Sequence, residues 1–358
     1  MVAEIPVLRP KLIAYSRFAH RLEQIDSERI YSNGGAQNQE LVEIISSYFG
    51  VDKDQVVIGS SATLMLTGAA VVMGQDRWFL PSWTFSASAL ALSNAGCHLC
   101  FIDIDPQSHV ADVSKLRKRS NLLVVAPFGE QLTIDSEFNR CDFLLVDAAA
   151  SVAHPVQYSP DFRGKERTVE IYSLHATKVL GVGEGGFAIV YDRSLAAKLR
   201  SWTNFGFDGS RSSSFAGTNA KMSEYSAAIG CETFLQANAE FEEWRASRAR
   251  AETQEKRVGA SGFFHSREHV APYWIFTIPG VRVQSHVMSS NLLESGIASR
   301  QWWGSGCHTM PFFSSVEKLG PLAGTVQVAR STIGLPFSRD LSSNDFTRIG
   351  DELENILS

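Results

Sequence analysis

The sequence contains few cysteines, no long hydrophobic run and no excess of positive charge. Its 5 cysteines are scattered and odd in number, which argues against a disulfide framework and fits a reducing compartment. The longest apolar stretch, around residues 79–92, is broken by Pro81 and several hydroxyl residues, so it is too short to cross a bilayer. The N-terminus carries charges and lacks the apolar core of a secretion signal, so we expect a cytoplasmic location.

The charge balance is mildly acidic. Asp plus Glu number 38 and Lys plus Arg 33, a net charge of −5, so the chain lacks the basic surface of a nucleic-acid-binding protein. Hydrophobic residues make up 44% and charged residues 20%, which argues against extensive disorder. At about 150 residues per domain, 358 residues suggest two domains or one large α/β unit.

Two short motifs have surroundings that favour a structural explanation. Cys97 and Cys100 have the spacing of half a zinc site, but no second pair of ligands follows, so we expect a buried strand and no metal. The run 181–186 satisfies the glycine pattern of dinucleotide-binding loops. The residues after it are β-branched and aromatic and predict a strand, where a dinucleotide site requires a helix.

Strands alternate with helices over the first two thirds of the chain. The pattern predicts a helix at 37–49, a small-residue helix after a Gly-Ser-Ser turn, and a helix at 84–95. Strands are expected at 56–58, 77–80, 98–102, 122–126, 143–146, 169–173 and 187–191. This alternation is typical of an α/β fold with a mostly parallel, doubly wound sheet flanked by helices.

The sequence pattern changes from about residue 236. A long charged run at 237–257 predicts a helix, short strands are expected at 273–279 and 281–287, and a terminal helix at 343–357. We therefore predict a large α/β domain over residues 1–235 and a smaller C-terminal α+β domain over residues 236–358.

Two features at strand ends suggest a ligand site, since ligands of open α/β sheets gather there. In the strand–turn–helix segment 57–63, small residues let backbone N–H groups reach an anion at a helix N-terminus, although Ser and Thr also serve there as N-caps. Asp147 ends an apolar strand, where a carboxylate needs a partner such as a protonated pyridine nitrogen. Capping of a following helix is the alternative for Asp147.

A lysine and a loop complete the set. Lys178 lies between a predicted strand and the glycine run; a desolvated lysine amine forms Schiff bases, whereas a solvated one only extends into water. The Gly- and Ser-rich loop 205–222, which contains Asn219, leads into a helix. An anion-binding turn, a strand-end Asp and a Lys, in this order, fit a site for pyridoxal 5'-phosphate.

The sequence resembles the DegT/StrS family of pyridoxal-phosphate-dependent sugar aminotransferases, which have fold type I. The resemblance covers the chain from about Ile30 to its end and rests on GSSAT, PSWTF, GCHLCFIDIDP, LLVDAAAS, YSLHATKVLGVGEGG and GTNAKM. It implies that the large domain binds the cofactor. The residues implied to be catalytic are Lys178, as the amine that forms the aldimine, and Asp147, as the partner of the pyridine nitrogen.

The resemblance also implies the remaining cofactor contacts. Phe85 would stack on the cofactor ring. The residues implied to hold the phosphate are Ala62, Thr63 and Ser173, and Ser61 is also expected to bind the cofactor. Asn219 would reach the phosphate of the neighbouring subunit, which implies a homodimer with shared active sites. Two positions depart from the family pattern: Ala150 stands where Gln or His is common, and Lys221 where Arg is usual.

The implied reaction moves an amino group from L-glutamate to a nucleotide-linked keto-deoxysugar, in a ping-pong cycle of deoxyaminosugar, polysaccharide or O-antigen biosynthesis. The favoured substrate is a 4-keto-6-deoxy sugar, and its 3-keto isomer is the alternative. Lys178, where dehydratases of the family have His, favours transamination. The alternatives are another pyridoxal-phosphate-dependent reaction such as dehydration, a non-catalytic regulator that binds the cofactor, and a nicotinamide enzyme using the glycine run. Adjacent Trp302 and Trp303 could form a flat face for a sugar or base, or pack in the core.

Overall fold

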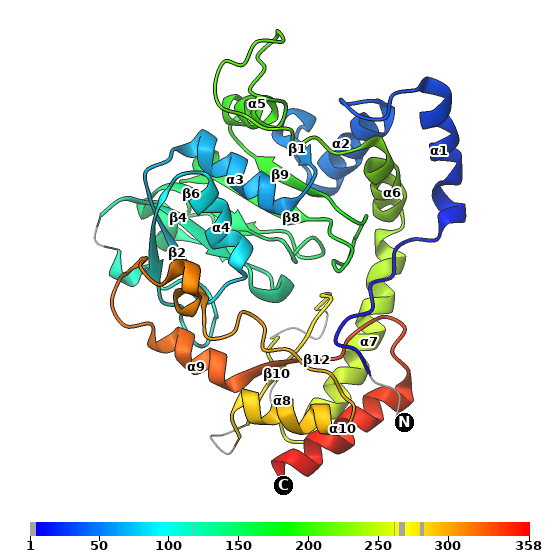
Figure 1. The fold of residues 1–358 in the computed structure, drawn as a ribbon, viewed down its shortest axis with the longest axis vertical. Coiled ribbons are helices and arrows are strands. Elements are labelled where there is room, and N and C mark those ends of the chain that lie inside the picture. Colours follow the sequence, from blue (N-terminus) through cyan, green and yellow to red (C-terminus); the bar gives the residue numbers. More distant parts are fainter. Residues whose placement is uncertain (1–4, 117, 261, 265–268, 280–282) are drawn as a thin grey trace.

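Figure 1 shows the computed structural model as a sheet with helices on both faces and a smaller group of helices and strands beneath it. The structure describes residues 5–116, 118–260, 262–264, 269–279 and 283–358. The helices are α1 (Tyr15–Glu28), α2 (Ala36–Phe49), α3 (Ala62–Met73), α4 (Ser86–Asn94), α5 (Arg193–Trp202), α6 (Glu224–Leu235), α7 (Ala237–Arg257), α8 (Ser285–Glu294), α9 (Ala323–Ser331) and α10 (Ser343–Leu357). The strands are β1 (Val56–Gly59), β2 (Arg77–Pro81), β3 (His98–Ile102), β4 (Ser120–Val125), β5 (Thr133–Ile134), β6 (Cys141–Asp147), β7 (Gln157–Tyr158), β8 (Thr168–Ser173), β9 (Gly186–Val190), β10 (Trp274–Thr277), β11 (Glu317–Lys318) and β12 (Thr332–Leu335).

The main sheet has the strand order β1-β9-β8-β6-β4-β2-β3-β11. Its neighbouring strands are parallel, except that β9 runs antiparallel to both β1 and β8. The predicted α/β fold with a mostly parallel sheet is therefore confirmed, and each strand predicted before residue 236 lies within two residues of its expected bounds.

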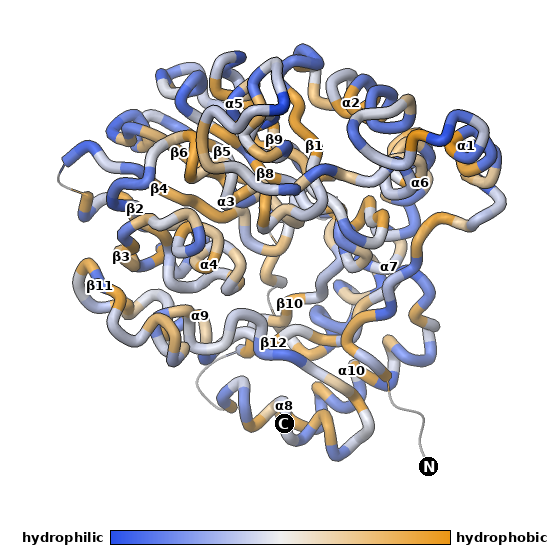
Figure 2. The backbone as a smooth tube through the Cα atoms, turned by 45° about the horizontal axis from the view of Figure 1, so that its top comes forward, coloured by the Kyte–Doolittle hydropathy of each residue, from blue (hydrophilic) through white to orange (hydrophobic). Residues whose placement is uncertain are grey.

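Both faces of the sheet are buried, as an α/β fold requires. In β6, Leu144 and Val146 pack on the face covered by α2 and α6. Leu145, between them, packs on the opposite face with α3, α4 and α5. The continuous apolar run of this strand follows from burial on both sides, and Figure 2 shows the hydrophobic strands inside the more hydrophilic outer turns.

The C-terminal part is built on a two-stranded antiparallel sheet of β10 and β12, with α7, α8 and α10 packed around it. The terminal helix forms at 343–357 as predicted. The short strand β11 joins the main sheet beside β3, so residues after 236 also contribute to that sheet. The division into domains 1–235 and 236–358 stays a prediction, although α6 ends at Leu235 and α7 begins at Ala237.

The strand expected at 281–287 is wrong. Residues 281 and 282 lie outside the described residues, Val283 and Gln284 are irregular, and residues 285–287 form the first turn of α8. The fully buried Met288 and Leu292, four residues apart, define the inner face of this helix. Burial of that face outweighs the β propensity of the valines. The sequence analysis also did not predict α1, α5 and α9.

All 5 cysteines are free and buried. Cys100 lies in β3, and Cys97 is the residue directly before this strand. The strand prediction is therefore confirmed. Among the described residues, no group of three or more His, Cys, Asp and Glu side chains is placed to hold a metal ion. None of the described helices has the length and apolar character needed to traverse a membrane.

A carboxylate from α6 caps α2 across the interface between the two helices. Glu224, 1% exposed, accepts hydrogen bonds from the backbone N–H groups of Gly35, Gln37 and Asn38 at 2.7, 2.8 and 3.2 Å. The Asn38 side-chain amide donates a further bond of 2.6 Å. Because the first N–H groups of a helix have no partner within it, this carboxylate satisfies them and complements the helix dipole.

We expect Glu224→Ala to lower the free energy of unfolding by about 1–3 kcal/mol, because buried donors lose a charged acceptor. Urea denaturation followed by circular dichroism measures the change. Glu23→Ala, at an exposed position of α1, serves as the control and should stay within about 0.5 kcal/mol of the parent protein. Equal effects of the two substitutions would contradict the capping role.

Candidate active site

Three predicted segments meet at the edge of the main sheet that the carboxyl ends of β6 and β8 form. Strands β6 and β8 are parallel, with Asp147 opposite Ile171, so the segments that follow them leave the sheet on the same side. Because β9 is antiparallel to both its neighbours, Gly186 lies opposite Gly59 of β1 and opposite Ser173 of β8. The turn after β1 therefore lies close to the carboxyl ends of β6 and β8.

A cavity of about 400 Å³ lies at this edge and contains most of the predicted site residues. The predicted residues that line it are Ser61, Ala62, Thr63, Phe85, Asp147, Ser173 and Lys178. Asn219 is exposed and does not line it, and its role across a subunit interface stays a prediction. Near Asn219, Lys221 Nζ donates to Asn204 Oδ1 at 3.0 Å.

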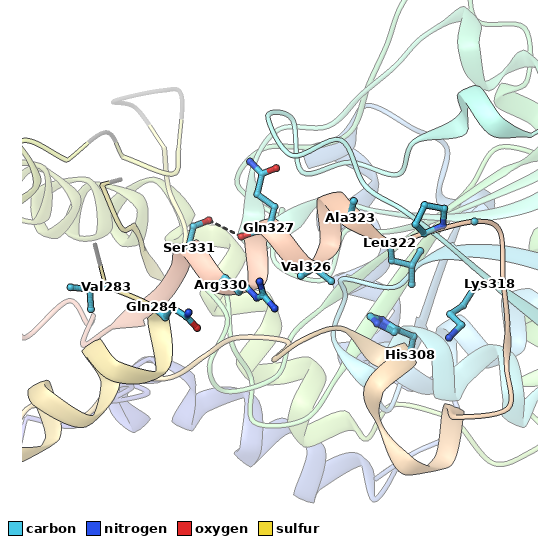
Figure 3. A pocket seen from close by; sticks show the side chains of 12 residues that line it. Val283, Gln284, His308, Lys318, Leu322, Ala323, Val326, Gln327, Arg330 and Ser331 are labelled. Carbon is cyan, nitrogen blue, oxygen red and sulfur yellow. Dashed lines mark hydrogen bonds between the residues drawn. The ribbon is translucent and has the colours of Figure 1, made fainter. Parts of the chain in front are cut away.

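A larger cavity of about 790 Å³ lies along α9 (Figure 3). His308, Lys318 and Arg330 contribute its basic side chains, and His308 is hydrogen-bonded to Ser82 at 2.7 Å. None of the predicted site residues lines this cavity. Size alone therefore does not identify the active site, and the smaller cavity is the candidate because it collects the reactive groups.

The N-terminus of α3 forms one wall of the site. Ser61 Oγ accepts the Leu64 N–H at 3.2 Å, which confirms its role as an N-cap, while the N–H groups of Ala62 and Thr63 belong to the first helical turn. A Cβ at Gly186 would lie 2.4 Å from the Ala62 nitrogen. Glycine at this position therefore lets β9 begin against the start of the helix. Here the glycine run leads into a strand, so the nicotinamide alternative lacks the helix it requires.

Asp147 is a buried carboxylate with two fixed hydrogen bonds. Its Oδ2 accepts from Ser88 Oγ at 2.6 Å and its Oδ1 accepts from the Ala149 N–H at 3.1 Å, while Thr84 holds Ser88 at 2.8 Å. Burial raises the pKa of Asp147, and the Ser88 and Ala149 hydrogen bonds and the charge of Lys178 oppose that rise. Turns follow Asp147, so the helix-capping alternative is wrong.

Lys178 lies in a turn between β8 and β9. The backbone N–H of Lys178 donates to the His175 carbonyl at 2.8 Å, and the backbone N–H of Ala176 donates to the carbonyl of Gly183 at 2.7 Å. Gly183 has a φ of 104°, a conformation that favours glycine. The half-buried Lys178 side chain places Nζ 2.7 Å from the Tyr273 hydroxyl, so the amine is held in the cavity rather than extended into solvent.

Aromatic side chains form a further part of the cavity wall. The ring of Phe85, at the start of α4, is 58% exposed and lines the cavity, so it is available to a flat ligand. Trp303 stacks on Phe128 with ring centroids 4.1 Å apart, and Trp302 meets Tyr273 edge-on at 5.1 Å. Both tryptophans also line the cavity. The packing interpretation is therefore confirmed, and binding of a sugar or base by these rings stays a prediction.

Ser88, Tyr273 and Arg300 were not predicted from the sequence. Ser88 lies four residues after Thr84, a spacing that places both side chains on one face of the helix predicted at 84–95, and in the structure both are fully buried. Tyr273 and Arg300 line the cavity, yet no local pattern links them to the lysine, because they come from the C-terminal part of the chain.

The groups in the cavity fit pyridoxal phosphate. Lys178 offers an amine for the aldehyde, Asp147 a buried anion for the ring nitrogen, and the start of α3 donors for the phosphate. Ala150 contributes only a methyl group to this wall. The assignment of each residue to an atom of the cofactor stays a prediction.

Comparisons with known proteins agree with this arrangement. The model of the DegT/DnrJ/EryC1/StrS aminotransferase family matches residues 14–354. GDP-perosamine synthase of Caulobacter vibrioides is 26% identical, with 99% of this chain and 98% of that protein covered. The dTDP-4-dehydro-2,3,6-trideoxy-D-glucose 4-aminotransferase of Saccharopolyspora spinosa is 25% identical over 86% of each chain. The crystal structure of DesI in the presence of its TDP-sugar product superposes with a TM-score of 0.86, at 26% identity, over 100% of this chain and 94% of DesI.

These findings confirm the predicted fold type, enzyme class and cofactor, because aminotransferases of this family depend on pyridoxal phosphate. With the family match extending over nearly the whole chain, the protein belongs to the DegT/DnrJ/EryC1/StrS aminotransferase family.

Proposed function

We propose that the protein is a sugar aminotransferase that moves an amino group from L-glutamate to a nucleotide-linked keto-deoxysugar. The observation that carries the proposal is the convergence of the Lys178 amine, the buried Asp147 carboxylate and the start of α3 on one cavity. The names of two relatives support the substrate class: one is a GDP-perosamine synthase, and the other aminates a dTDP-linked sugar at its position 4. The 4-keto-6-deoxy sugar, the glutamate donor, the homodimer and the cytoplasmic location stay predictions.

The chemistry divides between the cofactor and the chain. Pyridoxal phosphate, when bound, supplies an aldehyde that carries the amino group and a ring that accepts electrons from the substrate carbon. Lys178, when its amine is free, would act as a general base that takes a proton from the substrate carbon and then as the acid that gives up this proton to complete the transfer. Such a transfer requires the amine at a fixed place, and the turn 175–178 fixes the backbone from which the lysine side chain extends.

Asp147 stabilises positive charge on the ring nitrogen. Burial raises the pKa of this carboxyl, so its ionised form needs a cationic partner in the site. A protonated ring nitrogen meets that need, and the carboxylate in turn holds the proton on the nitrogen. Ser88 and the Ala149 N–H fix both carboxylate oxygens before any ligand enters, which is electrostatic preorganisation.

Arg300 is suited to recognise anionic substrates. Its exposed side chain lines the cavity, and its guanidinium lies 4.9 Å from the ring centroid of Trp302. Both proposed substrates carry anionic groups: glutamate has carboxylates and a nucleotide sugar has phosphates. A guanidinium can bind either group through two parallel hydrogen bonds.

A substrate panel tests the proposed function. Purified protein is incubated with pyridoxal phosphate, L-glutamate and several keto nucleotide sugars, and mass spectrometry and NMR identify the products. We expect an amino nucleotide sugar and 2-oxoglutarate, formed only when glutamate is present. A product formed without any amino donor would instead support dehydration. A cofactor absorbance band that glutamate leaves unchanged would support the regulator.

Removal of the lysine amine should abolish transamination. We expect Lys178→Ala to lower kcat by at least about 10²-fold, because the general base and acid is lost. The same substitution should prevent borohydride from fixing the cofactor to the peptide that contains residue 178, which mass spectrometry detects. Lys198→Ala, in α5 and outside the cavity, is the matched control and should retain activity. Unchanged turnover in Lys178→Ala would overturn the assignment.

Neutralisation of the buried carboxylate should slow the chemistry with little effect on the fold. We expect Asp147→Asn to reduce kcat by about 10²–10³-fold, because a preorganised charge is removed while the side chain keeps its shape. Steady-state kinetics at saturating cofactor measure the change. Asp142→Asn, an exposed partner of Arg119, should leave kcat unaltered. If Asp147→Asn had the same kcat as Asp142→Asn, the proposed charge stabilisation by Asp147 would be excluded.

A further inference from the structure

We propose that Tyr273 is a positioning residue that holds the Lys178 amine at one place in both of its protonation states. This inference rests on the proposed function and adds a residue that the sequence did not reveal. Nζ of Lys178 lies 2.7 Å from the hydroxyl oxygen of Tyr273, although the two residues are 95 positions apart in the chain.

The tyrosine ring is itself firmly held. Tyr273 is 8% exposed and directly precedes β10. Its ring meets Phe128 at a centroid distance of 5.6 Å and Trp302 at 5.1 Å, both edge-on. Contacts to both aromatic neighbours restrict the ring, so the hydroxyl has a defined position at the cavity wall.

A hydroxyl group suits an amine that gains and loses a proton. It accepts a hydrogen bond from an ammonium group, and it donates one to the lone pair of a neutral amine. A carboxylate can only accept, so an acidic side chain at this position would favour the ammonium form alone. Tyr273 therefore fixes the position of Nζ without committing Lys178 to one protonation state.

Other hydroxyl groups of the cavity wall are engaged elsewhere. Thr177 Oγ1 is paired with the His175 ring at 2.8 Å, and Ser173 Oγ accepts the His175 N–H at 3.2 Å. Thr84 Oγ1 is bonded to Ser88 at 2.8 Å. Of these four hydroxyl groups, the Tyr273 hydroxyl is the one hydrogen-bonded to Lys178 Nζ.

The proton balance of the step is simple. With the cofactor bound, the neutral Lys178 amine would take up a proton from the α-carbon of the amino donor and become an ammonium group, and it would give up the same proton to complete the transfer, so that Lys178 ends the step neutral. The Tyr273 O–H rotates from donor to acceptor when the amine is protonated and rotates back afterwards. The tyrosine gains and loses no proton over the cycle, and no further reactant is needed.

Tyr273→Phe in the cofactor-loaded enzyme tests the inference, because it removes the hydroxyl and keeps the ring packed between Phe128 and Trp302. We expect kcat to fall about tenfold or more, since loss of orientation affects the proton transfer. KM for the keto sugar should change much less. The pH midpoint of the bound cofactor's absorbance change should also shift by about half a unit or more, because the hydroxyl lies 2.7 Å from Nζ, the atom that would bond to the cofactor.

Tyr191→Phe is the matched control. It removes a tyrosine hydroxyl that donates to Glu170 at 2.8 Å and that lies outside the cavity lining. The control should keep the parent's kcat and absorbance midpoint. The other ionisable groups that line the cavity, Asp147, His175, Glu184 and Arg300, are unchanged in both variants, so a shift confined to Tyr273→Phe reports on its hydroxyl.

The outcomes separate the two proposals. If the parent enzyme forms the amino sugar and Tyr273→Phe matches it in both kcat and absorbance midpoint, the role of Tyr273 is excluded while the proposed function stands. If the parent enzyme shows neither the cofactor band nor an amino sugar, the proposed function fails, and the inference fails with it. Circular dichroism and thermal unfolding confirm that the variant is folded.

Discussion

The buried charge of Asp147 is the constraint on which the rest of the site depends. A carboxylate at the end of an apolar strand loses the solvation it would have in water, and this loss must be offset by hydrogen bonds or an opposite charge. Ser88 from α4 and the backbone after β6 supply two bonds, and the lysine that follows β8 supplies positive charge nearby. The strand order of the sheet makes this possible, because β6 and β8 are neighbours and parallel.

The residues that could be predicted from sequence are those with a local signal. Asp147 follows a run of apolar residues that is typical of a strand buried on both faces, and Lys178 comes shortly after the strand-like segment Thr168–Ser173. The order of these signals along the chain, together with the family resemblance, was sufficient for the fold and the enzyme class, and seven of the predicted site residues line the cavity. The glycine run was also correctly separated from a dinucleotide site, since the type of element that follows it can be judged from its β-branched residues.

The residues that could not be predicted depend on how distant segments meet. Tyr273 and Arg300 reach the cavity only because the C-terminal part folds back onto the edge of the sheet, and nothing near them in sequence encodes that contact. The same limitation explains the error at 281–287. There, alternating valines predicted a strand, but the burial of Met288 and Leu292 against neighbouring elements determines a helix.

The short strand β11 links the C-terminal part to the main sheet at its β3 edge. A fragment that ended at residue 235 would leave the outer edge of β3 with unpaired N–H and C=O groups. Exposed edges of this kind pair with other chains and promote aggregation. The C-terminal part therefore also protects the sheet, so a truncated cofactor-binding fragment is a poor starting point for expression or crystallisation.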